Sequence, residues 1–317
     1  MKNIICIISG PTASGKTSNS IALAKRFGGE IVNFDSLLFY KEITIGTAKP
    51  STLEQDGIKH HMIDCHNIKE PINAAEYLKE ALPVINKIHE RNEIVYLVGG
   101  SGFYLQALLH GMYESVTTPK EVIEKSNQLF TDEGILPFLE ILEAEDKESR
   151  TRYHDNDHYR IRRAVEHFWT TGNKFSESRE KMEDKKKHSP MIDLNWNVFH
   201  CYLDLDKDKH FEIIKSRTKK MLSDGLIDEV KSLIGQGFDG SEKPLLSIGY
   251  KEVFEYISGV HATLEGMEER INISTRQLAK SQRTWFKKVD KRQFNPITEK
   301  ELIQSEFSSF MNSLLEE

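Results

Sequence analysis

The sequence predicts an α/β fold in which helices flank a parallel β-sheet. Three short apolar segments, at residues 4–9, 30–34 and 94–98, are rich in β-branched residues and are separated by segments with helical spacing. A fourth apolar segment follows at 198–203. Strands that alternate with helices form parallel sheets, and such sheets bind ligands at the carboxyl ends of their strands. We therefore expect the functional residues to follow these strands.

The helices are predicted from apolar spacing and from stop signals. Between the first two strands, Ile21, Ala22 and Ala24 share a face, and Gly28-Gly29 ends the helix. Similar patterns predict helices over 17–27, 74–88, 211–222, 226–234, 248–257 and 267–289.

The character of the chain changes after Thr117. From Thr118 to about Pro190 it is highly charged, has no clear strand and includes the run Lys185-Lys186-Lys187. We therefore predict a helical insertion at 118–195 within one α/β core, which 1–117 and 196–317 form together.

The composition limits the protein class. Hydrophobic residues make up 38% and charged residues 29% of the 317 residues, as in a soluble protein with a buried core. No apolar stretch is long enough to span a membrane. Cys6, Cys65 and Cys201 lie far apart without zinc-site spacing, so we expect reduced thiols and a cytoplasmic location. A net charge of −6 disfavours a nucleic-acid partner, but it does not describe local potential.

A phosphate-binding loop follows the first strand. Residues 10–17 match the pattern G-x-x-x-x-G-K-[ST] between a predicted strand and a predicted helix. Backbone amides and the helix N-terminus can surround phosphate oxygens there, Lys16 supplies a cation, and the Thr17 hydroxyl can bind Mg²⁺. The candidate pyrophosphate-binding residues are Gly10, Pro11, Thr12, Ala13, Ser14, Gly15, Lys16 and Thr17.

The loop alone indicates a pyrophosphate group and does not indicate ATP. Enzymes that transfer a phosphoryl group from such a loop usually place an acid after another apolar strand. Here the strand at 94–98 ends in Gly99-Gly100-Ser101-Gly102, which contains no acid. Asp35-Ser36 follows the second strand instead, where Asp35 could act as a general base or could cap a helix.

Several widely spaced motifs resemble those of the tRNA dimethylallyltransferase family. Asp35-Ser36-Leu37-Leu38-Phe39-Tyr40 and Ile45-Gly46-Thr47-Ala48-Lys49-Pro50 carry the resemblance with the phosphate loop. The resemblance runs from residue 4 to about 290 in the family's order. The further matches are His60-His61-Met62-Ile63-Asp64, Gly99-Gly100-Ser101-Gly102-Phe103-Tyr104, Arg217, Gly225-Leu226-Ile227-Asp228-Glu229-Val230, Ile248-Gly249-Tyr250-Lys251 and Thr275-Arg276-Gln277-Leu278-Ala279-Lys280.

The resemblance implies a P-loop NTPase-like core with a tRNA-contacting insertion. It also implies transfer of a dimethylallyl group from dimethylallyl pyrophosphate to the exocyclic N6 amine of the adenine beside the anticodon. By resemblance, Asp35 is the base, and Arg217 helps Lys16 and Mg²⁺ to neutralise the pyrophosphate; from its pattern alone, Arg217 could be a surface charge. Ser101 replaces the family's threonine and would keep a hydrogen bond near the reacting atoms, although a turn serine is the alternative.

The tRNA contacts are expected on both parts of the chain. The family positions at Leu38 and Tyr159 usually hold glutamine, so we expect this chain to differ from the family in its exact tRNA contacts and in its tRNA selectivity. Residues expected to contact the anticodon stem-loop by resemblance are Asp35, Ser36, Leu37, Leu38, Ser101, Tyr159, Arg160, Ile161, Arg162 and Arg163. For the arginine trio, a solvated helix face paired with acids is the alternative. We expect a monomer.

A basic stripe is visible without the resemblance. Arg276, Lys280, Arg283 and Lys287 recur at helical spacing with no acid among them, which fits either a solvated face or a phosphate-backbone contact. The apolar residues Leu264, Met267, Ile271, Leu278, Trp285 and Val289 are predicted to lie roughly opposite.

Three other functions remain open. A relative that modifies free adenine nucleotides would not need the insertion. A small-molecule kinase would use Asp35 to deprotonate an alcohol and the segment from Arg160 to Arg163 as a phosphate lid. A non-catalytic RNA-binding protein would not need Asp35, Lys16 and Thr17 together.

Overall fold

The computed structural model describes residues 2–111, 118–179 and 189–316. These residues form two compact units, Met1–Leu108 with Leu194–Glu317 (unit 1) and Leu109–Asp193 (unit 2). Unit 2 begins earlier in the sequence than the predicted insertion at 118–195. The run Lys185-Lys186-Lys187 lies outside the described residues.

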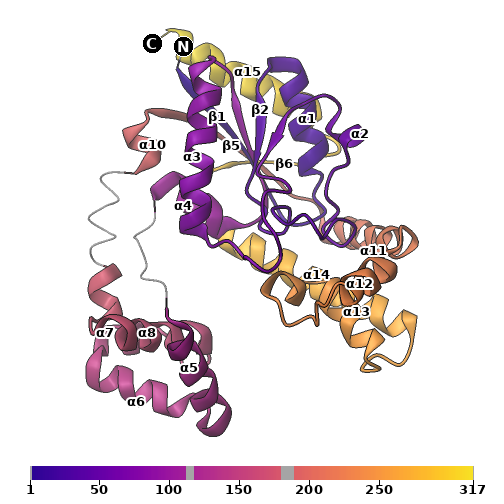
Figure 1. The fold of residues 1–317 in the computed structure, drawn as a ribbon. Helices are drawn as coiled ribbons and strands as arrows, with labels where there is room; N and C mark the ends of the chain where they lie inside the picture. Colours follow the sequence, from indigo (N-terminus) through magenta and orange to yellow (C-terminus); the bar gives the residue numbers. More distant parts are fainter. Residues whose placement is uncertain (1, 112–117, 180–188, 317) are drawn as a thin grey trace. The chain divides into compact units, whose positions relative to one another are not determined.

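Unit 1 is built on a six-stranded parallel sheet with the order β3-β2-β4-β1-β5-β6 (Figure 1). The central strand β1 pairs with β4 on one side and with β5 on the other, so that Ile5 lies opposite both Val95 and Val198. The strands are β1 Asn3–Ser9, β2 Glu30–Asn33, β3 His60–His61, β4 Val95–Val98, β5 Trp196–Leu203 and β6 Arg292–Phe294. The predicted α/β fold with a parallel sheet is confirmed.

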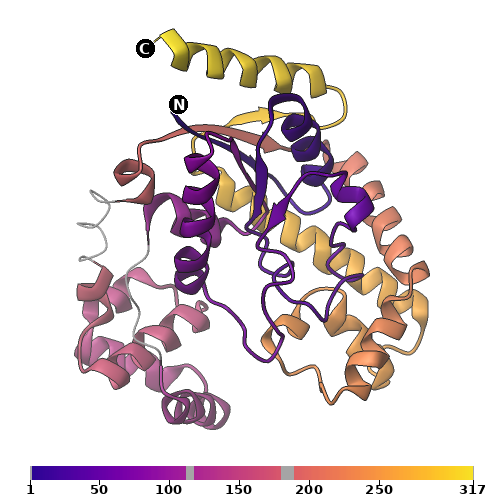
Figure 2. The same cartoon turned by 45° about the horizontal axis from the view of Figure 1, so that its top comes forward.

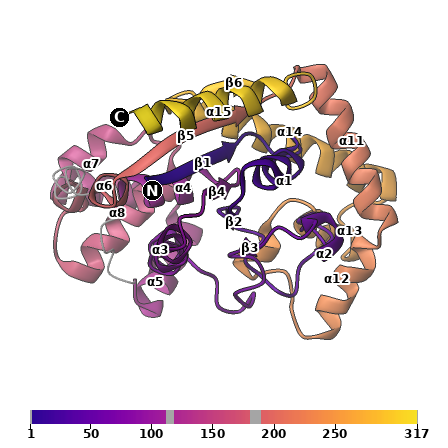
Figure 3. The ribbon, with the colours of Figure 1, turned by 90° about the horizontal axis from the view of Figure 1, so that it is seen from above.

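Helices cover both faces of this sheet. Figure 3 shows α1 (Lys16–Phe27) and α3 (Ala74–Glu90) on opposite sides of the strands. The C-terminal helix α15 (Lys300–Glu316), which follows β6 in the chain (Figure 2), packs against β5. Strands β3 and β6 and helix α15 were not predicted from the sequence.

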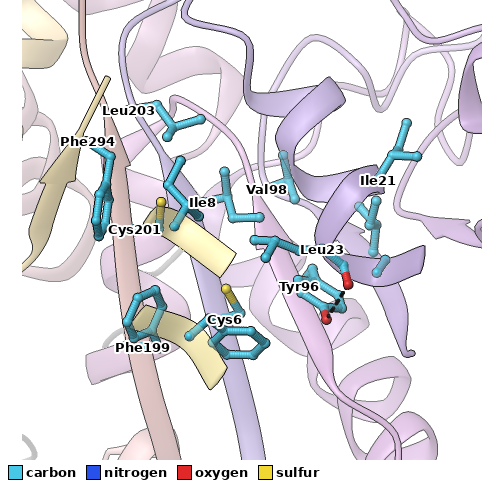
Figure 4. Close-up of a cluster of buried hydrophobic side chains, with 14 residues drawn as sticks. Cys6, Ile8, Ile21, Leu23, Tyr96, Val98, Phe199, Cys201, Leu203 and Phe294 are labelled. Atoms are coloured by element: carbon cyan, nitrogen blue, oxygen red, sulfur yellow. Dashed lines mark hydrogen bonds between the residues drawn. The ribbon is translucent and has the colours of Figure 1, made fainter. Parts of the chain in front are cut away.

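Alternation along the strands sorts the side chains into two layers. Cys6 and Ile8 of β1 point into the cluster shown in Figure 4, together with residues of β4, β5 and α1. Phe307 of α15 closes this cluster and is fully buried. The Tyr96 hydroxyl donates to the Leu23 carbonyl at 3.3 Å, which satisfies a polar group inside the cluster.

The remaining helices of unit 1 lie mostly after β5. The predicted helix at 211–222 is the longer α11 (Lys207–Ser223), and the predicted helix at 267–289 is α14 (Leu264–Phe286). Met267 and Ile271 of α14 are buried as predicted, but Leu264 and Leu278 are 41% and 40% exposed, so they do not belong to the apolar face. The other elements are α2 Thr52–Gln55, α4 Gly102–His110, α12 Leu226–Gly235, the 3-10 helix η1 Lys243–Leu246 and α13 Tyr250–Ile257.

Unit 2 is helical in its described residues and has its own core. Its helices are α5 Lys120–Glu133, α6 Leu136–Glu145, α7 Lys147–Arg152, α8 His158–Thr171 and α10 Pro190–Asp193. Phe138 and Leu142 of α6 pack with Ile161 and Val165 of α8 in a buried cluster. Across both units, none of the helices that the structure describes is long and apolar enough to cross a membrane.

Candidate active site

The loop after β1 has the backbone that phosphate binding requires. Gly10 has φ 149°, and a Cβ atom there would lie 2.2 Å from the Leu203 carbonyl oxygen, so only glycine fits. Gly15 has φ 75° at the start of α1, which turns the chain into the helix. The amides of this helix start, with their partial positive charge, therefore border the loop.

Lys16 is positioned over the loop. Its Nζ atom donates to the carbonyl oxygens of Gly10 at 3.2 Å and Pro11 at 2.8 Å. Burial lowers its pKa to about 8; Asp35 raises the pKa and Arg217 lowers it. A bound anion would stabilise the charged form of this amine.

Arg217 of α11 reaches the same site. Its guanidinium donates to the Thr12 hydroxyl at 3.5 Å and to the Thr47 carbonyl at 3.2 Å. Burial lowers its pKa, and nearby Asp35 opposes that effect. The alternative of a solvated surface charge is therefore wrong for Arg217.

These charged groups border one cavity of about 610 Å³. Its polar lining includes Lys16, Thr17, Asp35 and Arg217. Its apolar lining includes Ile21, Leu38, Ile45, Ala48, Val98 and Met221. The cavity therefore suits a molecule with an anionic head and a small apolar tail.

Asp35 stands where β2 ends, as predicted. Its amide donates to the Asn33 side chain at 2.9 Å, and its Oδ1 accepts from the Leu37 amide at 3.3 Å. Residues 36–39 form turns, so Asp35 caps a turn and does not cap a helix. Because Asp35 also lines the cavity, its carboxylate is available for proton transfer.

Ser101 contacts Ser36, the residue that follows Asp35. Its Oγ accepts from the Ser36 amide at 3.3 Å and donates to the Ser36 hydroxyl at 3.4 Å. A Cβ atom at Gly99 would lie 2.8 Å from the Asp35 nitrogen, so the ends of β4 and β2 are in direct contact. Ser101 is not among the described residues that line the cavity, and it reaches Asp35 through Ser36.

The loop at residues 44–48 forms one wall of the cavity, and residues that are distant in sequence hold it in place. The Glu229 carboxylate accepts from the amides of Thr44 at 2.7 Å, Ile45 at 3.0 Å and Gly46 at 3.2 Å. The Tyr250 hydroxyl donates to Glu229 at 2.7 Å and accepts from Gly46 at 3.0 Å. Glu229 and Tyr250 lie in motifs that match the family, but the sequence did not predict a role for either residue.

The other end of this loop is fixed by Lys49. Its buried Nζ donates to the Tyr40 carbonyl at 2.7 Å and forms an ion pair with Asp64. The family-like motifs at residues 45–50 and 60–64 thus meet in the structure.

A model of the IPP transferase family matches residues 38–289. This chain belongs to the IPP transferase family. The tRNA dimethylallyltransferase 2 of Geotalea uraniireducens (strain Rf4) is 37% identical over 284 residues, which cover 90% of this chain and 89% of that protein. The tRNA dimethylallyltransferase of Bacillus cereus is 36% identical over 285 residues, which cover 89% and 86%.

Solved structures agree with this membership in the IPP transferase family. The tRNA isopentenylpyrophosphate transferase of Bacillus halodurans superposes with a TM-score of 0.71 at 30% identity and covers 99% of both chains. A eukaryotic dimethylallyltransferase acting on tRNA gives a TM-score of 0.76 at 26% identity, covering 93% of this chain and 74% of that one. The fold of this chain is thus that of the IPP transferases.

The basic stripe of this IPP transferase differs from the prediction at Arg283. The Arg283 side chain is only 20% exposed and forms an ion pair with Asp204 at 2.7 Å. It also donates to His210 at 2.8 Å. The charge of Arg283 is thus already paired inside the protein, which favours a structural role, and its contact with tRNA phosphates stays a prediction. Its acid partner Asp204 lies in the segment between β5 and α11, far from the basic stripe in sequence.

The other members of the stripe are exposed. Arg276 lies over the Phe211 ring, with 4.2 Å from its guanidinium carbon to the ring centroid. Lys280 is exposed on α14, and Lys287 is exposed directly after the end of this helix. Arg276 and Lys280 therefore remain candidates for contact with a polyanion.

In unit 2, the predicted tRNA-contact residues divide into exposed and structural ones. Tyr159 is 75% exposed, and Arg160 is exposed and paired with Asp157. Ile161 is fully buried in the core of unit 2, so the prediction that it binds tRNA is wrong. Ile161 matches the family-like segment as a core residue of the helix.

Arg162 and Arg163 also have structural partners. Arg163 lies 2.9 Å from Glu166 and donates to the Thr118 hydroxyl at 2.9 Å. Arg162 lies 4.0 Å from Glu166, donates to Ser126 at 3.0 Å and covers the Phe130 ring. Both arginines fasten α8 to neighbouring segments of unit 2, and their predicted contact with tRNA phosphates stays a prediction. Glu166, three and four residues away, was the signal for this pairing.

The residues present fit a magnesium ion at the phosphate loop. Thr17 is exposed at the start of α1 and lines the cavity beside Lys16 and Asp35. Mg²⁺ prefers hard oxygen ligands, which a threonine hydroxyl and diphosphate oxygens supply. Elsewhere, Cys65, His66 and Glu80 have possible ligand atoms within 4.8 Å of one another, and the 2.8 Å ion pair of His66 with Glu80 accounts for that approach.

Proposed function

We propose that this chain transfers a dimethylallyl group from dimethylallyl pyrophosphate to the N6 amine of the adenine beside the anticodon of tRNA. The products are N6-isopentenyladenosine and pyrophosphate. One observation carries the proposal: Lys16, Arg217 and the Asp35 carboxylate line the same cavity as a set of apolar side chains. The relatives named tRNA dimethylallyltransferase support the choice of substrates.

The cavity accounts for binding of the donor. The loop amides with Lys16 and Arg217 would bind the diphosphate, and Leu38, Ile45 or Met221 would contact the five-carbon chain. As the bond between the allylic carbon and the bridging oxygen breaks, the diphosphate leaves with the electron pair. Cations held at that oxygen stabilise the transition state more than the bound donor.

Asp35 accounts for activation of the acceptor. The N6 amine of adenine is a weak nucleophile, because its lone pair is delocalised into the ring. As N6 forms a bond to the allylic carbon, Asp35 takes one N6 proton, so that the product amine is neutral. Ser101 and Ser36 keep Asp35 at the end of β2 through the bonds described above.

Mg²⁺ is the proposed cofactor, and the Thr17 hydroxyl would hold it with oxygens of the diphosphate. The ion would neutralise charge on the leaving group.

The acceptor base must leave the stacked anticodon loop to reach Asp35. Enzymes that act on a base extrude it and hold it by stacking and by edge contacts. In unit 2, Tyr159 and Arg160 are the exposed candidates from the predicted set. On unit 1, Arg276 and Lys280 are the candidates for phosphate contacts. We propose that the protein works as a cytoplasmic monomer, and the free thiols of Cys6, Cys65 and Cys201 fit a reducing compartment.

The test is a transfer assay with two substrates. The full-length protein is incubated with dimethylallyl pyrophosphate, Mg²⁺ and unmodified tRNA, and the tRNA nucleosides are analysed by mass spectrometry. We expect N6-isopentenyladenosine in tRNA and equimolar pyrophosphate. Modified free AMP with unmodified tRNA would favour transfer to free nucleotides. ADP formation from ATP and an alcohol would identify a kinase.

A further inference from the structure

Gln282 of α14 connects two parts of the site that are distant in sequence. Its Oε1 atom accepts a hydrogen bond from the Thr12 amide of the phosphate loop at 2.8 Å. Its Nε2 atom donates to the Gly100 carbonyl at 3.1 Å. A single side chain thus spans the ends of β1 and β4.

The packing around Gly100 shows that this contact is closely fitted. A Cβ atom at Gly100 would lie 2.5 Å from Gln282 Nε2. One turn further along α14, Trp285 covers Gly102, where a Cβ atom would lie 2.3 Å from the indole ring. The two glycines therefore let α14 lie directly on the turn that carries Ser101.

The Thr12 peptide is fixed on its other side as well. The Thr12 carbonyl accepts from His210 Nε2 at 2.8 Å, and His210 Nδ1 accepts from Arg283 at 2.8 Å. Asp204 holds Arg283 through a 2.9 Å bond to Nε. Gln282 of α14 thus holds the amide of Thr12, and His210 of α11 holds its carbonyl group. The part-buried Arg283 supports His210, which gives this arginine a structural role.

We propose that Gln282 is a positioning residue that couples the phosphate loop to the Gly100–Ser101 turn, and through Ser101 and Ser36 to Asp35. This inference rests on the proposed function. Gln282 is not among the described residues that line the cavity, so its effect passes through Thr12 and Gly100. It sets the separation of the diphosphate site from the base that removes the proton.

Such a role affects the rate more than donor binding. The allylic carbon and the attacking nitrogen must approach closely and in line, and a misplacement of about 1 Å can lower the rate roughly 100-fold. We expect Lys16 and Arg217 to keep holding the diphosphate in a Gln282 variant, because the contacts of Lys16 with Gly10 and Pro11 and of Arg217 with Thr47 do not involve Gln282 or Thr12.

The test compares Gln282→Met with Gln277→Met. Methionine has a similar length and volume but forms neither hydrogen bond of Gln282. Gln277 is an exposed glutamine on the same helix, so it controls for the loss of an amide. We expect Gln282→Met to lower kcat by about 10- to 100-fold, with a KM for dimethylallyl pyrophosphate and an affinity for inorganic pyrophosphate within about threefold of the wild type. Gln277→Met should match the wild type.

Amide hydrogen exchange measures the hydrogen bond between the Thr12 amide and Gln282 without requiring catalysis. The Thr12 amide should exchange faster in Gln282→Met than in the wild type, while β1 and β4 stay protected. Unchanged exchange at Thr12 would overturn the inference whether or not the wild type transfers a prenyl group. A kcat within twofold of the wild type, or a loss of pyrophosphate affinity equal to the loss of kcat, would also overturn it. Absence of prenyl transfer by the wild type would instead reject the proposed function.

Discussion

The Tyr250 hydroxyl donates a hydrogen bond to the Glu229 carboxylate at 2.7 Å, and both groups accept from the amide of Gly46. A Cβ atom at Gly46 would lie 2.5 Å from the Tyr250 ring, so the loop passes directly over it. Burial, followed by the charge of Glu229, raises the pKa of Tyr250. The phenol therefore stays protonated and keeps donating to Glu229. This pair fixes one wall of the donor cavity.

Glu229→Gln should loosen that wall. An amide cannot accept from the Thr44, Ile45 and Gly46 amides and from Tyr250 as a carboxylate does, so at least one buried donor is left without a partner. We expect a loss of about 1–3 kcal/mol in the free energy of unfolding, measured in urea, with an increase in KM for dimethylallyl pyrophosphate. The neighbouring exposed Asp228 is the control, and Asp228→Asn should change stability by less than about 0.5 kcal/mol.

Asp35→Asn tests the general base. The amide keeps the shape of the side chain and can accept from the Leu37 amide, but it cannot take the N6 proton. We expect kcat for tRNA modification to fall by about 10²- to 10⁴-fold, while the Kd for tRNA, measured by filter binding, stays within about twofold. Turnover equal to that of the wild type would remove Asp35 from the base role.

The lowered pKa of Lys16 predicts a pH dependence of donor binding. Its pKa is about 8, so the amine is charged below that pH and loses its charge as the pH rises above it. A diphosphate binds the charged form and raises this pKa. The Kd for pyrophosphate, measured by calorimetry, should therefore be constant below pH 8 and should rise above it, by at most about tenfold per pH unit.

The Lys16→Arg variant is the control for this profile. A guanidinium stays charged throughout this pH range, so the variant should bind with a flat profile even if its affinity is lower. The same alkaline weakening in Lys16→Arg would assign the titration to another group. Lys16→Ala should weaken binding of dimethylallyl pyrophosphate at every pH below 8.

Arg276 and Lys280, two exposed cations of α14, should contribute to tRNA affinity through counterion release. We expect the double variant Arg276→Ala and Lys280→Ala to weaken tRNA binding and to reduce the slope of log K against log salt by roughly one to two. Lys300→Ala, at the start of α15, is an exposed control that should leave the slope unchanged. An unaltered slope in the double variant would identify a solvated face.

The sequence alone predicted the parts of the site that depend on local spacing. The loop from Gly10 to Thr17 is contiguous, and its glycines are required by the backbone itself, so the pattern was sufficient. Arg217 needed the family resemblance, because nothing in its helix shows that it faces a cavity. The contact of Glu229 with Gly46 joins residues 183 positions apart, and no periodic pattern reports such a pairing.

The features that the sequence did not reveal depend on partners that are distant in sequence. A cation was expected to be free wherever no acid stood beside it in the helical pattern, but Arg283 finds Asp204 across 79 residues. Strand β6 was missed because its three residues, Arg292–Phe294, are too few and too polar to form an apolar segment. They become a strand because β5 offers them an edge with unpaired backbone groups.

His200 in β5 gives a prediction for acid stability. Its Nε2 accepts from the Ser9 hydroxyl at 2.6 Å and its Nδ1 donates to the Asp290 carbonyl at 3.1 Å, which fixes the neutral ring between two strands and a loop. Burial lowers its pKa to about 4 from an ordinary value of 6.5. Between these pH values the unfolded chain binds a proton that the folded chain does not, so the free energy of unfolding must fall as the pH falls, by on the order of 3 kcal/mol at pH 4.

His200→Asn should be less stable at pH 7, since it loses these bonds, but its stability should fall less steeply between pH 6.5 and pH 4 in urea titrations. The exposed His154 serves as the control, because His154→Gln should keep the slope of the wild type; an equal slope in His200→Asn would show that other groups cause the acid sensitivity.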